Sequence, residues 1–359
     1  MSMKHRKLGI TSLLALGLAG CPDESDGTGA GGAGGEGGSG PSEPAWQAIF
    51  EDGELDRALL SVWGTSSTSV FVVGGPLGNA GFEALALRYD GSSWEDLAPG
   101  GADSFWWVTG ASDVDVWMVG EAGRISHFDG VSFEEHDAPT TATLWGAIAF
   151  APDDVWAVGG MVGGPATQPD DVVLHYDGAS WTAVTLPGEP QGRALFKVWG
   201  SSSDDLFVVG EAGILWHKQG DIWTLESDPP LAAGNLTTVH GCSATEVYAV
   251  GGRDVLRYDG AAWSKVDLPL SNDVNGVFCV DSETAALVGM GGLKQRRVDG
   301  AWTDDFIEVP HSNLHAVWAD ETGAFWAVGG DFVASPKPNV ARDGVVARFG
   351  PGSISDTVD

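Results

Sequence analysis

Apolar and polar positions alternate along most of the chain in short segments typical of β-strands. After residue 44, segments rich in Val, Trp, Phe and Tyr are separated by Gly and Asp-Gly, and no apolar stripe with helical spacing occurs among them. One phrase recurs, close to L-x-x-V-W-G-S-S-x-x-D-V-W-V-V-G, followed by a glycine-containing connection and then L-H-Y-D-G-x-x-W. Such self-similarity predicts a series of equivalent all-β units with four strands each.

The first half of the phrase occurs seven times, with a period that indicates one structural unit per copy. Equivalent positions lie 38 to 51 residues apart, the spacing of β-propeller blades. The first strand of a unit is apolar on both faces, as in Val62 and Trp63, which suits a blade packed between two others. We therefore expect an all-β, seven-bladed β-propeller with four antiparallel strands per blade over residues 45–352. The seven copies span residues 59–74, 105–120, 144–159, 195–210, 236–251, 274–289 and 314–329.

The two ends of the repeat region predict how the ring closes. The outermost strand of each unit begins with an aromatic residue, but the seventh unit ends after Phe349 without one. Residues 45–50, A-W-Q-A-I-F, are similar to S-W-T-A-V at 180–184 and supply the missing strand. We expect this N-terminal strand to complete the last blade, which leaves no open sheet edge. Residues 353–359 are expected to form a C-terminal tail outside the propeller.

The first 44 residues carry an export signal rather than part of the fold. A basic start, K-H-R-K, precedes an apolar run that is shorter than the about 20 residues needed to span a bilayer. The run ends in L-A-G-C, which resembles the lipobox of bacterial lipoproteins, where cleavage between Gly20 and Cys21 leaves a cysteine that carries a diacylglycerol. We expect residues 1–20 to be a signal peptide and residues 21–44 to be the lipidated cysteine with a disordered, glycine-rich linker. The protein would then be exported to the cell envelope and anchored by lipid, in the outer membrane rather than the inner one, facing the periplasm or the cell surface.

The sequence motifs of the repeats are also similar to those of a known group of proteins. V-W-G-S-S, D-V-W-A-V-G and H-Y-D-G-x-x-W together resemble the seven-bladed repeat lipoproteins of myxobacterial type. The resemblance implies the fold and export, since most members of that group have no assigned activity. The D-G-x-x-W turns resemble a degenerate Asp-box of sialidase-type propellers, in which the box is a folding element, so they imply no catalytic residue.

Charge and motifs narrow the chemistry. The chain has 18 Lys and Arg against 50 Asp and Glu, a net charge of −32, which excludes nucleic acid as a partner because there is no basic surface to neutralise phosphates. The sequence contains no G-x-S-x-G, H-E-x-x-H, P-loop or Cys-x-x-Cys motif. We therefore predict no catalytic residue, no metal ligand and no cofactor.

The histidines and acidic residues mostly occupy repeated positions. His127 and His175 share one column of the third strand, so they lie on different blades and are assigned to blade packing rather than to a metal. Asp115 and Asp154 precede the second strand, where Asp accepts backbone hydrogen bonds in a turn. A pair of carboxylates on the channel face would instead indicate glycan hydrolysis or cleavage, which is kept as an alternative function.

The candidate binding residues are aromatic side chains that break the repeat. Twelve of the sixteen tryptophans belong to three repeat columns, and Trp106, Trp107, Trp145 and Trp216 do not. The first three open inner strands, at the mouth of the central channel, where the connections at 75–81, 160–171 and 330–343 are long. We predict a ligand face there, with Trp106, Trp107 and Trp145 as stacking platforms and His315 nearby. Packing between blades is the alternative interpretation of the same tryptophans.

Two cysteines remain besides Cys21. Cys242 and Cys279 fall one column apart at the ends of inner strands in adjacent units, which places their Cα atoms within the about 7 Å that a disulfide tolerates. An oxidising compartment permits the bond, and two buried free thiols are the alternative.

The sequence thus predicts a membrane-tethered, exported and monomeric lipoprotein. Its propeller would be a rigid, non-catalytic binding platform for a protein, a peptide or a glycan. Two alternatives stay open, a carbohydrate-active enzyme with carboxylates on the channel face and an assembly factor for an envelope complex.

Overall fold

The computed structural model describes residues 43–51, 53–163, 171–188, 192–226 and 231–359. Residues 41–359 form one compact unit. The expected signal peptide, the cleavage site between Gly20 and Cys21, the lipidation site and all but the end of the linker lie outside the described residues. The described part of the chain has no helix with the length and hydropathy required to cross a membrane.

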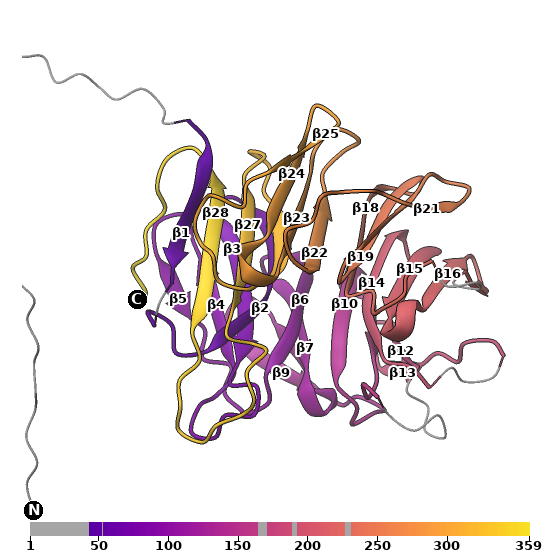
Figure 1. Ribbon diagram of the computed structural model, residues 1–359. Helices are drawn as coiled ribbons and strands as arrows, with labels where there is room; N and C mark the ends of the chain where they lie inside the picture. Colours follow the sequence, from indigo (N-terminus) through magenta and orange to yellow (C-terminus); the bar gives the residue numbers. More distant parts are fainter. Residues whose placement is uncertain (1–42, 52, 164–170, 189–191, 227–230) are drawn as a thin grey trace, which may run out of the picture. The chain divides into compact units, whose positions relative to one another are not determined.

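Within the described residues, 28 strands form seven four-stranded antiparallel sheets, which are arranged in a ring. Figure 1 shows this ring from the side, with the inner strands β2, β6, β10 and β14 nearly upright. Six blades run from the inner to the outer strand in chain order, as β2-β3-β4-β5 does in blade 1. The predicted all-β, seven-bladed propeller is confirmed.

The strands of blades 1 to 4 have the following bounds. Blade 1 contains β2 (Ala58–Ser66), β3 (Ser69–Gly75), β4 (Leu85–Tyr89) and β5 (Trp94–Asp96). Blade 2 contains β6 (Phe105–Ser112), β7 (Asp115–Gly120), β8 (Ile125–Phe128) and β9 (Phe133–His136). Blade 3 contains β10 (Leu144–Ala151), β11 (Asp154–Gly159), β12 (Val172–Tyr176) and β13 (Trp181–Ala183). Blade 4 contains β14 (Leu195–Ser202), β15 (Asp205–Gly210), β16 (Leu215–Gln219) and β17 (Ile222–Leu225).

The remaining blades complete the ring. Blade 5 contains β18 (Thr238–Ser243), β19 (Glu246–Gly251), β20 (Asp254–Tyr258) and β21 (Trp263–Lys265). Blade 6 contains β22 (Val274–Cys279), β23 (Ala285–Gly289), β24 (Lys294–Val298) and β25 (Ala301–Asp304). Blade 7 contains β26 (Leu314–Ala319), β27 (Phe325–Gly330), β28 (Gly344–Gly350) and β1 (Ala45–Phe50). Short 3-10 turns follow the second strand in three blades, at Glu121–Gly123, Glu211–Gly213 and Met290–Gly292.

The N-terminal strand closes the ring. β1 pairs with β28 in the sheet order β1-β28-β27-β26, with Trp46 opposite Phe349 and Ala48 opposite Ala347. The first and last described strands therefore share blade 7, as the incomplete aromatic column of the sequence predicts.

Inner strands of adjacent blades are joined by a pairing between tryptophan and glycine. Trp63 of blade 1 lies over Gly110 of blade 2, where an added Cβ would come within 2.7 Å of Trp63 Cη2. The missing side chain lets the indole span the space between the two blades. The same arrangement recurs for Trp199 with Gly241 and for Trp318 with Gly64.

A second repeated contact lies within blades 2, 3 and 4, between the second and third strands. His127 in β8 stacks on Trp117 with 4.3 Å between ring centroids, and its Nε2 lies 2.6 Å from Asp115 Oδ1. The repeated histidines therefore pack the blades, in agreement with the interpretation of the sequence. Asp115 and Asp154 differ from it, because they bind histidine and tryptophan side chains where backbone N–H donors of a turn were expected. Equivalent contacts join His175 to Trp156 and Asp154, and His217 to Phe207 and Asp205.

The C-terminal residues differ from the sequence prediction, because they pack on blade 1 instead of lying outside the propeller. Val358 forms a parallel bridge with Trp94 in β5, and Trp94 N–H donates to Thr357 O at 2.9 Å. The indole Nε1 of Trp94 also donates to Ser355 O at 3.1 Å, and Ile354 packs on the core of blade 1. The outer edge of a three-residue strand has free backbone groups, and residues 353–359 pair with them.

Candidate ligand-binding site

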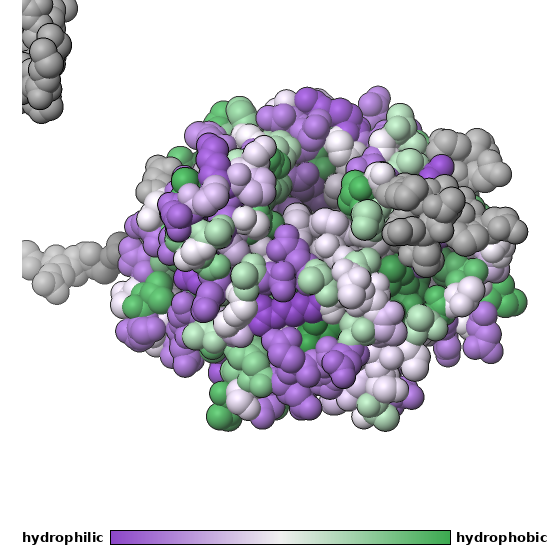
Figure 2. Space-filling view, turned by 90° about the horizontal axis from the view of Figure 1, so that it is seen from below, coloured by the Kyte–Doolittle hydropathy of each residue, from purple (hydrophilic) through white to green (hydrophobic). Residues whose placement is uncertain are grey.

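The site predicted from the sequence lies where the inner strands begin. One position near the start of each inner strand forms a ring around the mouth of the central channel. Figure 2 looks onto this face, on which polar and apolar residues are interspersed. The ring members, in blade order, are Leu60, Trp106, Trp145, Phe196, Thr237, Asn275 and His315.

Four of these side chains form an aromatic group, here called the mouth cluster: Trp106, Trp145, Phe196 and His315. Trp106 and Trp145 meet edge to face with 4.5 Å between ring centroids, and Trp145 meets Phe196 at 5.9 Å. Trp106 also reaches His315 of blade 7, at 5.7 Å. The structure thus brings together three of the four residues that the sequence predicts as a ligand site, and their binding role stays a prediction.

The polar atoms of the two tryptophans differ. Trp145 Nε1 donates to Gly160 O at 2.8 Å. Trp106 Nε1 is buried and has no hydrogen-bond partner among the described residues. A buried N–H without an acceptor costs free energy, so this indole nitrogen is a local cost within the mouth cluster.

Two long connections build a rigid rim beside the mouth cluster. Phe332, in the connection between β27 and β28, packs on His315 with 5.1 Å between ring centroids, and Leu77, in the connection between β3 and β4, packs in the same group as Trp106 and Phe332. Figure 1 shows these two connections side by side at the lower left. Arg342, only 2% exposed, donates hydrogen bonds to backbone oxygens of both connections, so it fixes their positions relative to each other.

Trp107 lies farther inside the channel than predicted, beyond the mouth cluster. The pairing of β6 with β7 shifts register between Phe105 and Trp107, and this bulge sends Trp106 and Trp107 to different levels of the channel. Lys197 of blade 4 extends toward the ring of Trp107, with Nζ 4.4 Å from the ring centroid. The Lys197 stem passes over Gly146, where a Cβ would lie 3.0 Å from Lys197 Cδ.

Burial strongly lowers the pKa values of two residues beside Trp107, Lys197 and His315. Lys197 is 4% exposed, its ammonium donates to Trp145 O at 2.5 Å, and burial lowers its pKa to about 7. Burial, with the positive charge of Lys197, lowers the pKa of His315 to about 3, against the effect of its hydrogen bond to Leu60 O. His315 is therefore neutral at physiological pH, with Nδ1–H donating to Leu60 O and Nε2 left as an acceptor.

On the side of Trp107 away from the mouth cluster, the channel contains a cavity of about 270 Å³, here called the inner chamber. Its walls include Trp63, Trp107, Trp199, His240, Phe278 and Trp318. Trp63, Trp199 and Trp318 belong to one repeat column of the sequence, which was expected to pack between blades. These side chains do pack between blades, but they also surround the channel. Because one residue of the column comes from each blade of a ring, the sequence could have indicated this second role.

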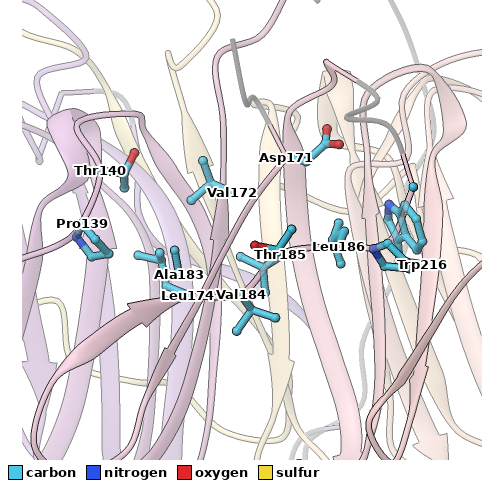
Figure 3. A pocket seen from close by; sticks show the side chains of 13 residues that line it. Pro139, Thr140, Asp171, Val172, Leu174, Ala183, Val184, Thr185, Leu186 and Trp216 are labelled. Carbon is cyan, nitrogen blue, oxygen red and sulfur yellow. The ribbon is translucent and has the colours of Figure 1, made fainter.

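A second concavity lies outside the channel, between blades 3 and 4. Figure 3 shows this groove of about 250 Å³, with Val172, Leu174, Val184 and Leu186 on its walls. Trp216, the fourth tryptophan that departs from the repeat columns, also lines it. It is 3% exposed, and its Nε1 has no hydrogen-bond partner among the described residues.

The lining of the inner chamber supplies no carboxylate. Among the described residues that line it, none is Asp or Glu, and His240 is its single titratable side chain. The described residues also contain no group of three His, Cys, Asp or Glu side chains suited to a metal ion. The channel is therefore equipped for stacking and hydrogen bonding.

The predicted cysteine pair also comes together. The structure joins Cys242 and Cys279 across blades 5 and 6, with their Cα atoms 4.9 Å apart. Oxidation of this pair stays a prediction, as does the export that would permit it.

The fold and its channel define the class, a seven-bladed β-propeller with an aromatic channel mouth. Similar solved structures include YCF48 from Cyanidioschyzon merolae, with a TM-score of 0.60 and 15% identity over 85% of this chain and 98% of that chain. YCF48 bound to D1 peptide has a TM-score of 0.61 and 14% identity, over 86% and 99% of the two chains. A streptogramin B lyase has a TM-score of 0.62 and 12% identity, over 86% and 98%. At these identities the likeness shows the fold alone. No protein-family model matches the chain, and no curated protein is similar to it in sequence.

Proposed function

We propose that the protein is an exported lipoprotein, anchored through Cys21, whose propeller binds a polypeptide segment at the mouth cluster without chemistry of its own. The observation that carries the proposal is the mouth cluster itself. Four side chains, of which Trp106, Trp145 and His315 depart from the repeat, meet at the channel mouth, beside a rim held by Arg342. Aromatic side chains on a rigid scaffold bind ligands at low cost in conformational entropy.

The comparisons support a polypeptide as the ligand. One similar structure is YCF48 bound to D1 peptide, so a propeller of this shape has a peptide-binding relative in fold. Nε2 of His315 adds an acceptor for a peptide N–H, and the rings of Trp106 and Trp145 add stacking surfaces. A glycan could use the same indoles by stacking, and the binding test includes it for that reason.

The two alternative functions make different demands. A glycan hydrolase or lyase with acid and base carboxylates needs a pair of them on the channel face, and the described lining of the inner chamber has none. The similarity to a streptogramin B lyase concerns the fold. An assembly factor would differ from a general peptide binder by one partner held in fixed ratio.

The binding test compares three proteins against an array of synthetic peptides and an array of glycans. They are the wild type, Trp106→Ala with Trp145→Ala, and the control Ile222→Ala, a substitution at a 69% exposed residue on the outer strand β17. We expect peptide binding that the double variant loses and the control keeps. Binding that is equal in all three proteins would contradict the proposal. Release of shortened glycans would support the enzyme, and one envelope protein retained at fixed ratio would support the assembly factor.

The anchor is tested separately. Cys21→Ser removes the thiol that would carry the lipid, so we expect the protein to leave the membrane fraction and to lose incorporation of a labelled fatty acid. Cys242→Ser is the matched control, since it removes a cysteine within the propeller. Membrane association that survives in the Cys21 variant would refute the lipid anchor.

A further inference from the structure

The inner chamber lies apart from the mouth cluster and has its own chemistry. Trp107 lies at the end of the chamber nearest the mouth cluster. The rings of Trp63, Trp199, Phe278 and Trp318 contribute to its sides. None of the described residues on its wall is Asp, Glu, Lys or Arg. A charged molecule would lose its hydration there without gaining a counterion, so the chamber favours an uncharged occupant.

His240 gives the chamber a polar group in a defined state, beside the hydroxyls of Thr109 and Thr238. Its Nδ1 accepts a hydrogen bond from the backbone N–H of Cys279, at 3.1 Å. A neutral imidazole that accepts at Nδ1 carries its proton on Nε2, so Nε2–H is a donor. Burial lowers the pKa of His240 to about 3, which keeps the ring neutral at physiological pH. No described residue accepts a hydrogen bond from Nε2, although His240 lines the chamber.

The size of the chamber limits the occupant further. A cavity of about 150 Å³ with apolar walls holds one benzene molecule. The inner chamber measures about 270 Å³, which suits a molecule of two fused rings. Aromatic walls favour flat, unsaturated rings, because edge-to-face and offset contacts between rings are attractive.

We propose that the inner chamber is a second binding site, for an uncharged bicyclic aromatic molecule whose oxygen accepts a hydrogen bond from Nε2–H of His240. This site goes beyond the proposed polypeptide binding, because Trp107 and Lys197 separate the chamber from the mouth cluster. Its ligand class follows from three observations: aromatic walls, the absence of charge on the described lining, and the Nε2–H donor of His240.

Three compounds of similar size test the proposal by isothermal titration calorimetry on the purified full chain. Coumarin has two fused rings and a carbonyl acceptor, naphthalene has two fused rings and no acceptor, and 2-naphthoate carries a negative charge. We expect coumarin to bind about three- to tenfold more tightly than naphthalene, the ratio that one net hydrogen bond gives. We expect no binding of 2-naphthoate in the chamber.

Two variants locate the binding. His240→Phe keeps an aromatic ring and removes the donor, so coumarin should fall to the affinity of naphthalene. Because this change also removes the acceptor of Cys279 N–H, a second variant avoids that contact. Ile148→Trp places an indole at the chamber position of blade 3, and because Leu206 Cδ2 already occupies the space over Gly200 of blade 4, the indole has to extend into the chamber. It should fill the chamber and abolish binding of coumarin and naphthalene while circular dichroism and the unfolding midpoint stay near those of the wild type.

The outcomes that overturn the proposal are distinct. Equal affinity for coumarin and naphthalene in the wild type would remove the role of His240. Tighter binding of 2-naphthoate than of coumarin would assign the channel to anions and point to Lys197 instead. Coumarin binding that persists in a folded Ile148→Trp variant would place the site elsewhere, and failure of coumarin to bind the folded wild type would refute the site.

Discussion

The glycine of each V-W-G step faces one inner-strand side chain of the preceding blade, and the size of that side chain explains most of these glycines. Where that residue is Trp, the facing position is glycine, as for Trp199 and Gly241. Where it is Thr109, His240 or Phe278, the facing position is Ala149, Cys279 or Ala319. The position that faces Ile148 is Gly200 of the next blade, and its Cβ site is occupied by Leu206 of its own blade. At Gly64, Gly110 and Gly241, the size of the facing tryptophan therefore limits what the residue can be.

Gly241→Ala should lower the free energy of unfolding by about 1–3 kcal/mol, the cost typical of overpacking in a closed core. The added Cβ would overlap Cη2 of Trp199, whose rigid indole cannot bend away. Gly234→Ala is the matched control, because nothing lies within 4 Å of its Cβ position. Urea unfolding measures both, and equal midpoints for the two variants would contradict the pairing.

Two histidines should make opposite contributions to stability as pH changes. Burial opposes protonation of His217, but its hydrogen bonds to Glu226 and Asp205 outweigh burial and raise its pKa. The stabilisation it provides is present below its unfolded pKa of about 6.5 and is lost as pH rises through the raised folded pKa. Burial lowers the pKa of His136, so the stabilisation from its neutral form is present above about pH 6.5 and is lost as pH falls.

The measurement compares unfolding of the wild type with His217→Gln and with His136→Gln at pH 5 and pH 8.5. The deficit of the His217 variant should be larger at pH 5, and that of the His136 variant larger at pH 8.5. The two variants act as controls for each other, since general acid destabilisation would shift both in the same direction. A common direction would refute the assignment.

The level that a channel residue occupies could be predicted from the sequence only in part. Trp106, Trp145 and His315 could be placed at the mouth because they depart from the repeat at equivalent positions. Trp107 could not, since its level depends on a bulge in the pairing of β6 with β7 that leaves no mark in the pattern of residues. Lys197 could not be predicted as a channel residue either, because its position over Gly146 and against Trp107 depends on contacts between three blades.

At the scale of elements, strands were predictable because period-two patterning and Asp-Gly turns are local signals. Gly91, after Asp90, has φ of 98°, as the predicted turn between third and fourth strands requires. Contacts of the connections were not predictable. Arg342 joins the connections of blades 1 and 7 through backbone carbonyls, which no residue pattern reveals. The packing of residues 353–359 on β5 was missed because its backbone hydrogen bonds impose few demands on sequence.

Removal of residues 353–359 should destabilise blade 1 by about 1–3 kcal/mol, because two backbone hydrogen bonds and the contact of Ile354 are lost. The amides of β5 should then exchange with deuterium faster than those of the equivalent strand β13. Thr357→Ala is the control, since Thr357 contributes its backbone oxygen and the change keeps that bond. Unchanged protection of β5 after truncation would show that the segment leaves this edge in solution.

The Cys242–Cys279 bond should link blades 5 and 6 and stabilise the fold by about 2–4 kcal/mol, since it closes a loop with a sequence separation of 37. Reduction should therefore lower the urea midpoint of the wild type. The same reductant should leave the midpoint of a Cys242→Ala, Cys279→Ala variant unchanged. Intact mass gives the direct check, because uptake of an alkylating reagent at both cysteines before reduction would show free thiols.

At the scale of the whole molecule, stability depends on one junction between the two ends of the described chain. β1 supplies the outer strand of blade 7, and Trp46 Nε1 donates to Asp305 of blade 6 at 3.0 Å, where Arg296 also binds. A chain that begins at residue 52 should lose the strand and this contact together. It should also expose the edge of β28, which promotes pairing between molecules.

The shortened chain should therefore unfold at lower urea concentration and self-associate in light scattering. A synthetic peptide of residues 43–51 should restore both the midpoint and the monomer, because it can re-form the pairs of Trp46 with Phe349 and Ala48 with Ala347. A peptide with Trp46→Ser keeps the backbone bonds but lacks the indole, so it should rescue only weakly. If the shortened chain stays monomeric and as stable as the full chain, blade 7 does not depend on its fourth strand, and the ring is held by contacts between inner strands alone.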